Sequence, residues 1–395
     1  MAAFDPAAAT AAYLATMPPT AQARASAYTH GGEWLTLWDA VVAVLAAALI
    51  IRSRLLVRTQ GAIERKRPHP LLASAAVAAL YLALDFVLEL PWSAYAGWWR
   101  ERSYGLSSQP FAGWLTDQLI GVATSLVLFT LFLVALYALM RRVRRTWWIW
   151  AGALTAAAVA FLVLIQPVFI EPLFNKYTVA PEGPVREAVV ALAKKAGVPS
   201  AKIYIYNGSK QSNRYTANVS GLGGTARVAL SDVMFAKGAD LSEVRAVVGH
   251  EMGHYKHMHV PLTAVVLGVL AVLALWITDR IFPLACRWLG SDAVGIADPA
   301  GLPVLAAIVA VLALLGAPLL NTLTRMTEAN ADSFSLQVAN EPDGQARALM
   351  KSADYRAPRP SALEEFLFYD HPSVEHRVRK AMDWKAAHGS GGAGR

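Results

Sequence analysis

Long apolar stretches dominate the pattern of hydrophobic and polar positions along the chain. A helix that crosses a bilayer needs about 20 predominantly apolar residues. Tryptophans such as Trp34, Trp92 and Trp147 gather near the ends of the stretches, as in the aromatic belts of membrane proteins. The pattern therefore predicts six transmembrane helices. They run approximately over Trp34–Val57, Leu71–Trp92, Leu115–Met140, Trp147–Ile170, Val260–Phe282 and Gly301–Leu323.

Two polar regions interrupt this pattern. Residues 171–259 lie between the fourth and fifth stretches, and residues 324–388 follow the sixth. Because two membrane crossings separate them, both regions lie on the same side of the membrane and can form one domain. We therefore expect helices 1–4 in residues 34–170, helices 5 and 6 in residues 260–323, and a single polar domain that is split in sequence.

The two ends of the chain differ from the rest. Residues 1–33 form a polar segment without the basic start and apolar run of a cleavable signal peptide, so the first transmembrane helix is expected to act as the insertion signal. Residues 389–395 are rich in glycine and are expected to be a flexible tail.

The first polar region has a mixed pattern. Pro184–Ala196 begins with proline and is followed by Gly197, and its apolar positions recur with helical spacing. Residues 202–206 alternate as a strand does, and Val219–Leu222 and Arg227–Leu230 flank a glycine-rich turn. The prediction for this region is an α+β domain.

Composition narrows the class of protein. Hydrophobic residues make up 55% of the chain and charged residues 16%, where soluble domains carry roughly 25% charged residues. This excludes a disordered chain and an ordinary cytosolic enzyme. The single Cys286 excludes an internal disulfide and a cysteine metal site. The net charge of +8 arises from basic residues beside apolar stretches, so it does not indicate nucleic-acid binding.

Three carboxylates lie within or at the ends of the first two apolar stretches: Asp39, Asp85 and Glu89. A carboxylate inside a membrane is costly and faces the protein interior or water. A position near the lipid headgroups is the alternative, mainly for Asp39.

The sequence His250-Glu251-Met252-Gly253-His254 is the clearest chemical motif. Residues four apart share one face of a helix, so both histidines can bind one metal ion. Glu251 is displaced around the helix, where its carboxylate can take a proton from a water activated by the metal. The alternative is two ordinary surface histidines.

Glu328 can supply a third ligand. It follows the sixth stretch, four residues before Asp332. A His-His-Glu set is typical of catalytic zinc, because it leaves one position open, and Asp332 can accept the second ring proton of a ligand histidine. The alternative is an exposed helix face paired with Arg325.

Further candidates surround these motifs. His371 can donate a hydrogen bond to a developing oxyanion, and Arg377 can pair with Asp332 or Glu328. Alone, His371 is more often an ordinary hydrogen-bonding residue. His257 and His259 are interpreted as interfacial residues, with contact to metal or substrate as the alternative. We also expect the strand Arg227–Leu230 to offer an open edge to an extended peptide.

These residues carry a resemblance to the CAAX prenyl protease type 1 family of integral-membrane zinc metallopeptidases. The similar stretches are GHEMGHYKH around His250, TRMTEANADSF around Glu328, DHPSVEHRV around His371, FNKYT at 174–178, SGLGGTARVALSD at 220–232 and RSYGLSSQ at 102–109. They extend over residues 34–379 in the same order.

The resemblance implies a fold and a site. The fold is a barrel of transmembrane helices around a water-filled chamber, closed by an α+β zincin-like domain. The resemblance implies that His250, His254 and Glu328 bind one Zn²⁺ per chain and that Glu251 activates water. Asp332 would then support a ligand, and His371 and Arg377 would support the active site.

Two departures from the family stand out. Eukaryotic members have seven transmembrane helices and this sequence predicts six, with residues 1–33 resembling the loop after the missing one. The family also has Asn-Ala-aromatic before the hairpin, where this chain has Thr216-Ala217-Asn218. The substrate-backbone contact of that Asn would therefore pass to Thr216 or Asn218.

Loop charge and the family resemblance disagree about the side of the membrane on which the polar domain lies. Arginines and lysines fill the first and third loops, which lie opposite the polar domain, so the positive-inside rule places this domain outside the cytoplasm. The resemblance places it inside. We favour the cytoplasmic side, in a bacterial inner membrane.

Three functions compete. The first is a zinc endopeptidase that processes prenylated CAAX proteins. The second is an endopeptidase that clips misfolded membrane proteins, which suits the Ala- and Arg-rich, bacterial composition. The third is a membrane scaffold or transporter with a relic metal site, against which Glu251 argues because a structural site needs no base. All three act at the lipid bilayer, and the first two take peptide or protein substrates.

Overall fold

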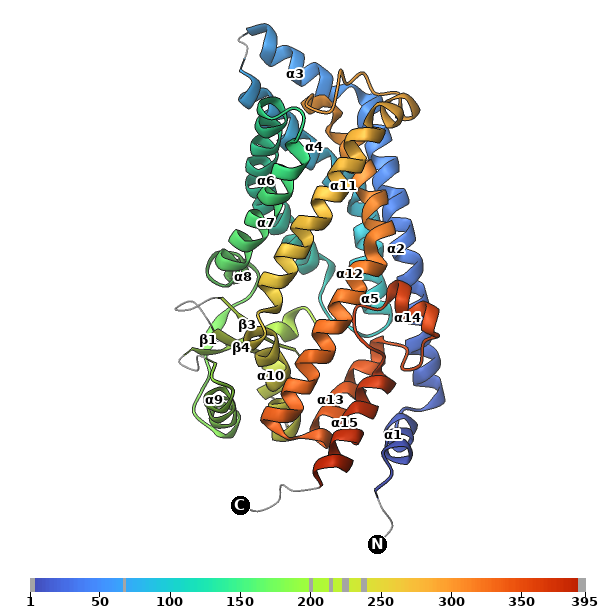
Figure 1. Cartoon of the computed structure of the whole chain (residues 1–395), viewed down its shortest axis with the longest axis vertical. Coiled ribbons are helices and arrows are strands. Elements are labelled where there is room, and N and C mark those ends of the chain that lie inside the picture. Colours follow the sequence, from blue (N-terminus) through green and yellow to red (C-terminus); the bar gives the residue numbers. More distant parts are fainter. Residues whose placement is uncertain are drawn as a thin grey trace.

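Six long helices form the framework of the molecule. The computed structural model describes residues 4–66, 69–198, 202–212, 216–221, 227–235 and 240–389. In this part of the chain, six helices are long and apolar enough to cross a membrane, as predicted. They run along the long axis, and the sheet and the polar helices gather towards one end (Figure 1). They are α2 (Pro19–Ser53), α4 (Pro70–Ser93), α6 (Phe111–Arg142), α7 (Trp147–Ile165), α11 (His259–Leu289) and α12 (Leu302–Ala339).

Two of these helices extend well beyond their apolar stretches. α2 begins at Pro19, about four turns before Trp34. Its early turns are held by tertiary contacts, such as that of the Arg100 guanidinium, which lies 4.0 Å from the ring centre of Tyr28. α12 continues without a break to Ala339 and carries Glu328 into the polar region. The apolar stretches predicted the membrane-spanning part of these helices but not the residues at which the helices begin and end.

Short segments connect the long helices. α4 passes through η1 (Ala94–Trp99) into α5 (Arg100–Ser103), and α7 passes through η2 (Gln166–Ile170) into α8 (Glu171–Phe174). α3 (Leu55–Lys66) follows Arg54, which has a left-handed backbone, and lies at the end of the molecule away from the sheet (Figure 1).

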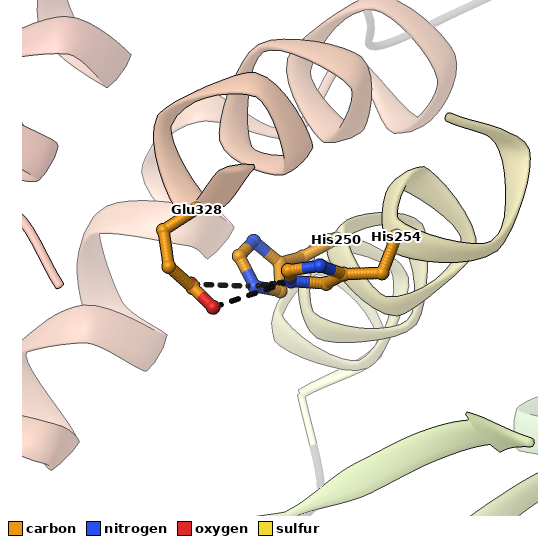
Figure 2. Close-up of side chains that lie close together, drawn as sticks. All are labelled: His250, His254 and Glu328. Atoms are coloured by element: carbon orange, nitrogen blue, oxygen red, sulfur yellow. Dashed lines mark hydrogen bonds and ion pairs between the residues drawn. The ribbon is translucent and has the colours of Figure 1, made fainter. Parts of the chain in front are cut away.

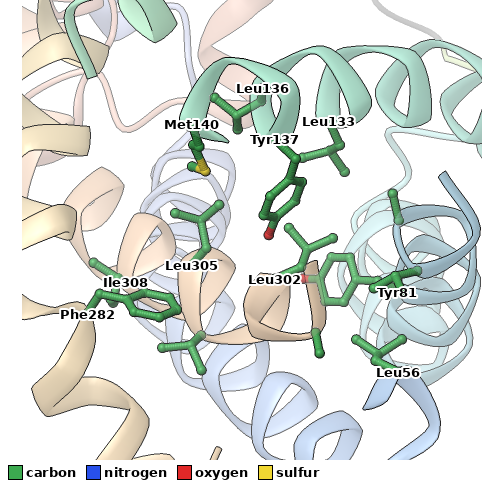
Figure 3. Packing of buried hydrophobic residues seen from close by; sticks show 14 of the residues in the cluster. Leu56, Tyr81, Leu133, Leu136, Tyr137, Met140, Phe282, Leu302, Leu305 and Ile308 are labelled. Atoms are coloured by element: carbon green, nitrogen blue, oxygen red, sulfur yellow. The ribbon is translucent and has the colours of Figure 1, made fainter. Parts of the chain in front are cut away.

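A hydrophobic core joins the membrane helices near that end. Tyr81, Tyr137, Met140, Phe282 and Leu305 come from α4, α6, α11 and α12 and pack in one cluster (Figure 3). Outward-facing side chains on the same helices are also apolar: Val87, Leu131, Val269 and Leu315 are 63%, 64%, 64% and 70% exposed. Apolar surface on both sides of a helix is typical of a membrane segment.

A cavity of about 460 Å³ lies between α2, α4 and α12. Asp39, Glu89 and Trp92 line it, opposite small residues of α12 such as Ala313. Trp92 Nε1 donates a hydrogen bond to Asp39 Oδ1 at 2.5 Å. Asp39 and Glu89 therefore line a hollow between these helices.

The sheet has four strands in the order β1-β2-β4-β3: β1 (Tyr177–Val179), β2 (Ile203–Tyr206), β4 (Arg227–Ser231) and β3 (Ala217–Ser220). β1 and β2 are antiparallel, β2 and β4 are parallel, and β3 and β4 are antiparallel. The predicted strand at 202–206 and the pairing across the predicted hairpin are confirmed. The turn at 222–226 lies outside the described residues.

The prediction that Arg227–Leu230 forms an open edge is wrong. β4 pairs on both sides, with β2 and β3, and all its residues are buried. A continuous apolar run such as Val228-Ala229-Leu230 is typical of a central strand. The edge beside it is β3, which also contacts α10 (Leu241–Lys256).

Helices complete the polar end of the molecule. The helix predicted at Pro184–Ala196 is confirmed as α9, and its apolar side packs with the sheet and α10 in one hydrophobic core. The other elements are α13 (Pro342–Ser352), α14 (Ala362–Phe368), α15 (Val374–His388), and the single-turn helices η3 (Gly208–Lys210), η5 (Asp232–Phe235), η6 (Pro299–Gly301) and η7 (Ala353–Tyr355).

The N-terminal segment is ordered by contacts with the C-terminal helices. α1 (Pro6–Ala15) packs against α15 and α13, and Leu14 shares a hydrophobic core with Val378 and Met382. Tyr13 donates a hydrogen bond to Asp343 at 2.8 Å, and Asp343 also binds Lys385 at 2.7 Å. The two ends of the chain thus meet beside the polar domain.

Candidate active site

The histidine motif lies on α10, which packs closely against α12. Asp240 caps the start of α10, and Val244, Val248 and Met252 bury one side of it in the core under the sheet. Gly253 faces α12 on the other side, where a Cβ would lie 2.9 Å from Ala331 Cα. The two helices therefore approach nearly backbone to backbone, which brings His250 and His254 next to Glu328.

His250, His254 and Glu328 converge on one point (Figure 2). His250 Nε2 lies 3.0 Å from Glu328 Oε2, His254 Nε2 lies 3.3 Å from Glu328 Oε1, and the two Nε2 atoms are 3.1 Å apart. Glu328 Oε2 is buried and accepts no hydrogen bond of good geometry. A buried carboxylate oxygen without a donor is costly, and a metal ion would satisfy it. These residues fit a three-ligand metal site.

Asp332 and Arg377 lie behind His250. Asp332 Oδ1 is 2.9 Å from His250 Nδ1, the ring nitrogen that faces away from Glu328. Arg377 donates to both oxygens of Asp332, from Nε at 2.7 Å and from Nη2 at 2.8 Å. A histidine that binds metal through Nε2 must carry its proton on Nδ1, and a carboxylate there fixes that form. Arg377 compensates the buried negative charge.

His371 lies on the other side of Glu328. Its Nε2 is 3.2 Å from Glu328 Oε2, and its Nδ1 is 2.7 Å from Asp370. Burial lowers the pKa of His371, and the hydrogen bond to Asp370 opposes this only in part. Arg325 does not pair with Glu328 or Asp332, the alternative considered above. Instead it donates to the Glu365 carbonyl at 2.7 Å and so supports the segment before His371.

Glu251 is largely enclosed beside the ligands. Burial raises the pKa of its carboxyl above the usual range, against the lowering effect of His250 and His254. A raised pKa brings a carboxylate closer to what a general base at neutral pH requires. Burial raises the pKa of Tyr206 on β2, and the hydrogen bond to Thr216 opposes this. The carboxylates of Glu171 and Glu251 lie near enough to add to the increase.

The start of the edge strand β3 and the residue before it hold the three predicted substrate-binding residues, Thr216, Ala217 and Asn218. Thr216 precedes β3, and its hydroxyl lies 2.7 Å from the Tyr206 hydroxyl. Ala217 pairs with Leu230 and Asn218 with Ala229. Asn218 Oδ1 is buried and, among the described residues, has no hydrogen-bond partner. β3 contacts α10, so Ala217 and Asn218 lie on the strand that neighbours the histidine helix, and Thr216 directly precedes it.

His259 was not recognised as part of the site from the sequence. It is 7% exposed, and its Nδ1 lies 3.0 Å from Nδ1 of His254. His259 begins the candidate membrane span α11, and the interfacial interpretation did not include its contact with His254, whereas His257 is exposed. The spacing of five residues from His254 fits no helical face, and the break between α10 and α11 that makes the contact is not visible as a motif.

The fold and the site together define a membrane-embedded metallopeptidase. Residues 180–385 match the profile of peptidase family M48, and residues 7–176 match that of the CAAX prenyl protease N-terminal region with five membrane helices. The chain belongs to peptidase family M48. It is an integral-membrane metalloendopeptidase of the CAAX prenyl protease type, and such enzymes use a divalent metal ion.

Individual relatives agree with this assignment. The chain is 30% identical over 300 residues to the uncharacterized metalloprotease YhfN of Bacillus subtilis, covering 74% of this chain and 69% of the relative. It is 26% identical over 296 residues to a CAAX prenyl protease 1 homolog of Arabidopsis thaliana, with the same coverage. The crystal structure of S. mikatae Ste24p superimposes with a TM-score of 0.75 at 19% identity, covering 93% of this chain and 90% of that one. That likeness shows the shared fold.

The N-terminal match contains one difference. The matched profile describes five membrane helices. Within residues 7–176, the described structure has four helices long enough to span, and α1 has ten residues, which is too short.

Proposed function

We propose that the metal is a single Zn²⁺ held by His250, His254 and Glu328. The donor set of two imidazoles and one carboxylate supports this, because it is typical of catalytic zinc. The unsatisfied Glu328 Oε2, on a carboxylate whose two oxygens face His250 Nε2 and His254 Nε2, is the observation that carries the proposal. Zinc bound there would polarise the scissile carbonyl and lower the pKa of the attacking water.

The chain's own groups then have distinct roles in peptide hydrolysis. Glu251 takes the proton of the attacking water and delivers it to the leaving nitrogen. His371, in its protonated form, donates from Nε2 to the oxyanion that forms on the carbonyl while Nδ1 donates to Asp370. Asp332 holds His250 with its proton on Nδ1, and Arg377 fixes Asp332. Support for these roles comes from the distances around Glu328 and from the burial of each group.

We also propose that residues 171–259 and 324–388 form one catalytic domain. The first supplies α10 with Glu251, and the second supplies the end of α12 with Glu328 and the helix α15 with Arg377. The contact between α10 and α12, which is among the most extensive between any two elements, supports this division.

The substrate is proposed to be a peptide that lies extended along β3. An edge strand offers free backbone groups to such a chain. Thr216, Ala217 and Asn218 would contact its backbone, and the unpartnered Asn218 Oδ1 supports this. The similarity to relatives named CAAX prenyl protease 1 supports prenylated proteins as the substrates of this chain. The cavity beside Trp92 offers apolar surface between the helices for a lipid group. The alternative is broad clipping of membrane proteins.

One cleavage assay tests the proposal and separates the two substrate classes. A farnesylated C-terminal peptide and its unprenylated twin are incubated with the enzyme in detergent, with Glu251→Ala as control. Chelator-sensitive cleavage of the lipidated peptide alone supports CAAX processing, and cleavage of both supports broad clipping. No cleavage of either, with one metal bound per chain, contradicts the enzymatic proposal and favours the scaffold.

The catalytic domain is proposed to face the cytoplasm of a bacterial cell from the inner membrane. The family resemblance supports this, whereas the basic residues of α3 and of the loop after α6 lie at the opposite end and argue against it. A reporter fused after residue 389 decides between the cytoplasmic side and the opposite side of the membrane. Fluorescence of a green fluorescent protein fusion supports the cytoplasmic side, and activity of an alkaline phosphatase fusion contradicts it.

A further inference from the structure

The second ring nitrogen of His254 faces another histidine. His254 Nε2 points to Glu328 and His250, and its Nδ1 lies 3.0 Å from Nδ1 of His259. The rings of His254 and His259 meet edge to face, with centres 5.0 Å apart and planes at 78°. The side chain of Asn330, two residues from both Glu328 and Asp332 on α12, lies beside His259.

We propose that His259 is a positioning residue that accepts the Nδ1 proton of His254 and thereby holds His254 ready to bind the metal. This rests on the proposed role of His254 as a ligand. The proton assignment follows from the geometry. A metal on Nε2 of His254 requires the proton on Nδ1. The facing Nδ1 of His259 must then be unprotonated, so His259 carries its proton on Nε2. The neighbouring side-chain oxygen of Asn330 can accept that proton.

The backbone between the two helices is shaped for this contact. Met258 separates α10 from α11 and has φ 54° and ψ 38°, a left-handed conformation that is strained for a residue with a Cβ. Its own side chain is 52% exposed, so packing of that side chain does not explain the strain. The turn at Met258 directs His259, the first residue of α11, back onto the last turns of α10.

The two histidine ligands thus receive different support. His250 donates to the carboxylate of Asp332, whereas His254 donates to an uncharged imidazole. A second carboxylate would add negative charge and weaken the metal as an electrophile. A neutral acceptor orients the ring and leaves the charge of the centre unchanged. The arrangement combines ligand orientation with strong polarisation of the substrate.

Metal affinity tests the proposal without relying on turnover. The full chain in detergent is titrated with Zn²⁺ against a chromophoric chelator, and the visible spectrum of the Co²⁺ form is recorded. We expect His259→Leu to weaken Zn²⁺ binding about 10-fold or more and to change the Co²⁺ spectrum. His259→Gln should recover most of the affinity, because its amide oxygen can accept the same proton. The control His388→Gln changes an exposed histidine at the end of α15, away from His259, and should leave both readouts unchanged.

The outcomes separate this inference from the proposed function. Equal Zn²⁺ affinity of the wild type and His259→Leu would overturn the role of His259. Equal weakening of Zn²⁺ binding by His259→Leu and His259→Gln would also overturn it, because that result indicates a packing effect alone. Asn330→Ala keeps both imidazoles and gives a second test if His259→Leu fails to fold. It should weaken binding to a smaller extent, and unchanged affinity contradicts the proton chain. A wild-type protein that binds no Zn²⁺ would instead contradict the metal site itself.

Discussion

Arg377 and Asp332 form a two-pronged buried ion pair, in which Nε and Nη2 of the arginine reach the two carboxylate oxygens at 2.7 and 2.8 Å. The side chains are 10% and 2% exposed. The pair links α15 to α12 directly behind His250. The last helix of the chain therefore bears on the orientation of a proposed metal ligand on α10.

Arg377→Met should destabilise the protein and weaken metal binding together. Removing one partner of a buried pair leaves an uncompensated charge, at a cost of about 3–5 kcal/mol. Thermal unfolding in detergent and Zn²⁺ titration measure the two effects. Arg379→Met is the matched control on the same helix: its pair with Asp383 is about half exposed, so a loss below about 1 kcal/mol is expected. Equal effects of both variants would contradict the role of Arg377.

Glu251→Gln should abolish peptide cleavage while leaving metal binding intact. The amide keeps the size of the side chain but cannot take a proton, and loss of a general base lowers kcat by about 100- to 10,000-fold. Single-turnover assays measure the loss of peptide cleavage, and mass spectrometry measures the metal content. Retained cleavage would show that another group acts as the base, and loss of metal would show that Glu251 supports the ligands.

Gly253→Ala should push α10 away from α12. The added Cβ would lie 2.9 Å from the backbone of Ala331, which cannot yield as a flexible side chain does. Overpacking of this kind costs about 1–3 kcal/mol, and the separation should also weaken Zn²⁺ binding. Gly316→Ala on α12 is the control, because its Cβ meets nothing within 4 Å. Unchanged metal affinity in Gly253→Ala would show that the helix contact does not set the site.

The docking of α1 should weaken at both extremes of pH. Burial raises the pKa of Asp343, but hydrogen bonds to Lys385 and Tyr13 outweigh it and the net pKa is lowered. Its contribution to docking is therefore present above about pH 4 and is lost as the pH falls. Burial and Asp343 raise the pKa of Tyr13 to about 12. Tyr13 therefore contributes below about pH 10 and its contribution is lost as the pH rises towards 12.

Electron paramagnetic resonance measures this docking directly. A spin label on Ala12→Cys, at an exposed position of α1, reports mobility in a Cys286→Ser background. Tyr13→Phe has no ionisable hydroxyl and should lose only the alkaline transition. If label mobility does not change between pH 3 and 12, the polar contacts of Tyr13 and Asp343 do not hold α1.

The sequence predicted the features that depend on local patterns. Apolar stretches gave the six membrane helices, and proline and glycine marked the ends of α9. The polar turns at the start of α2 were missed, because contacts with Arg100 rather than hydrophobicity hold them. β4 was misplaced at an edge, because its parallel partner β2 is about 25 residues away and parallel pairing leaves no turn signal.

The site shows the same division. His250 and His254 are linked by helical spacing, and Glu328 and Asp332 by a second helix, so their groups were visible as motifs. His259 was missed because its contact with His254 depends on the unusual backbone of Met258. A left-handed non-glycine residue leaves no pattern in the sequence around it. The assigned roles of all these residues remain predictions for the experiments above.

The meeting of the two chain ends also bears on when the enzyme can become active during its synthesis. During translation, Glu328 is made after the histidine motif, and Arg377 is made later still. The contacts of α15 include those with α1, which precedes it in the chain. Chains fold from the N-terminus as they emerge. A nascent chain would therefore already hold the histidine motif while lacking its third ligand and the arginine behind it. Hydrolytic capacity would then arise only after α15 has been made, when the six long helices of the described structure are already in place.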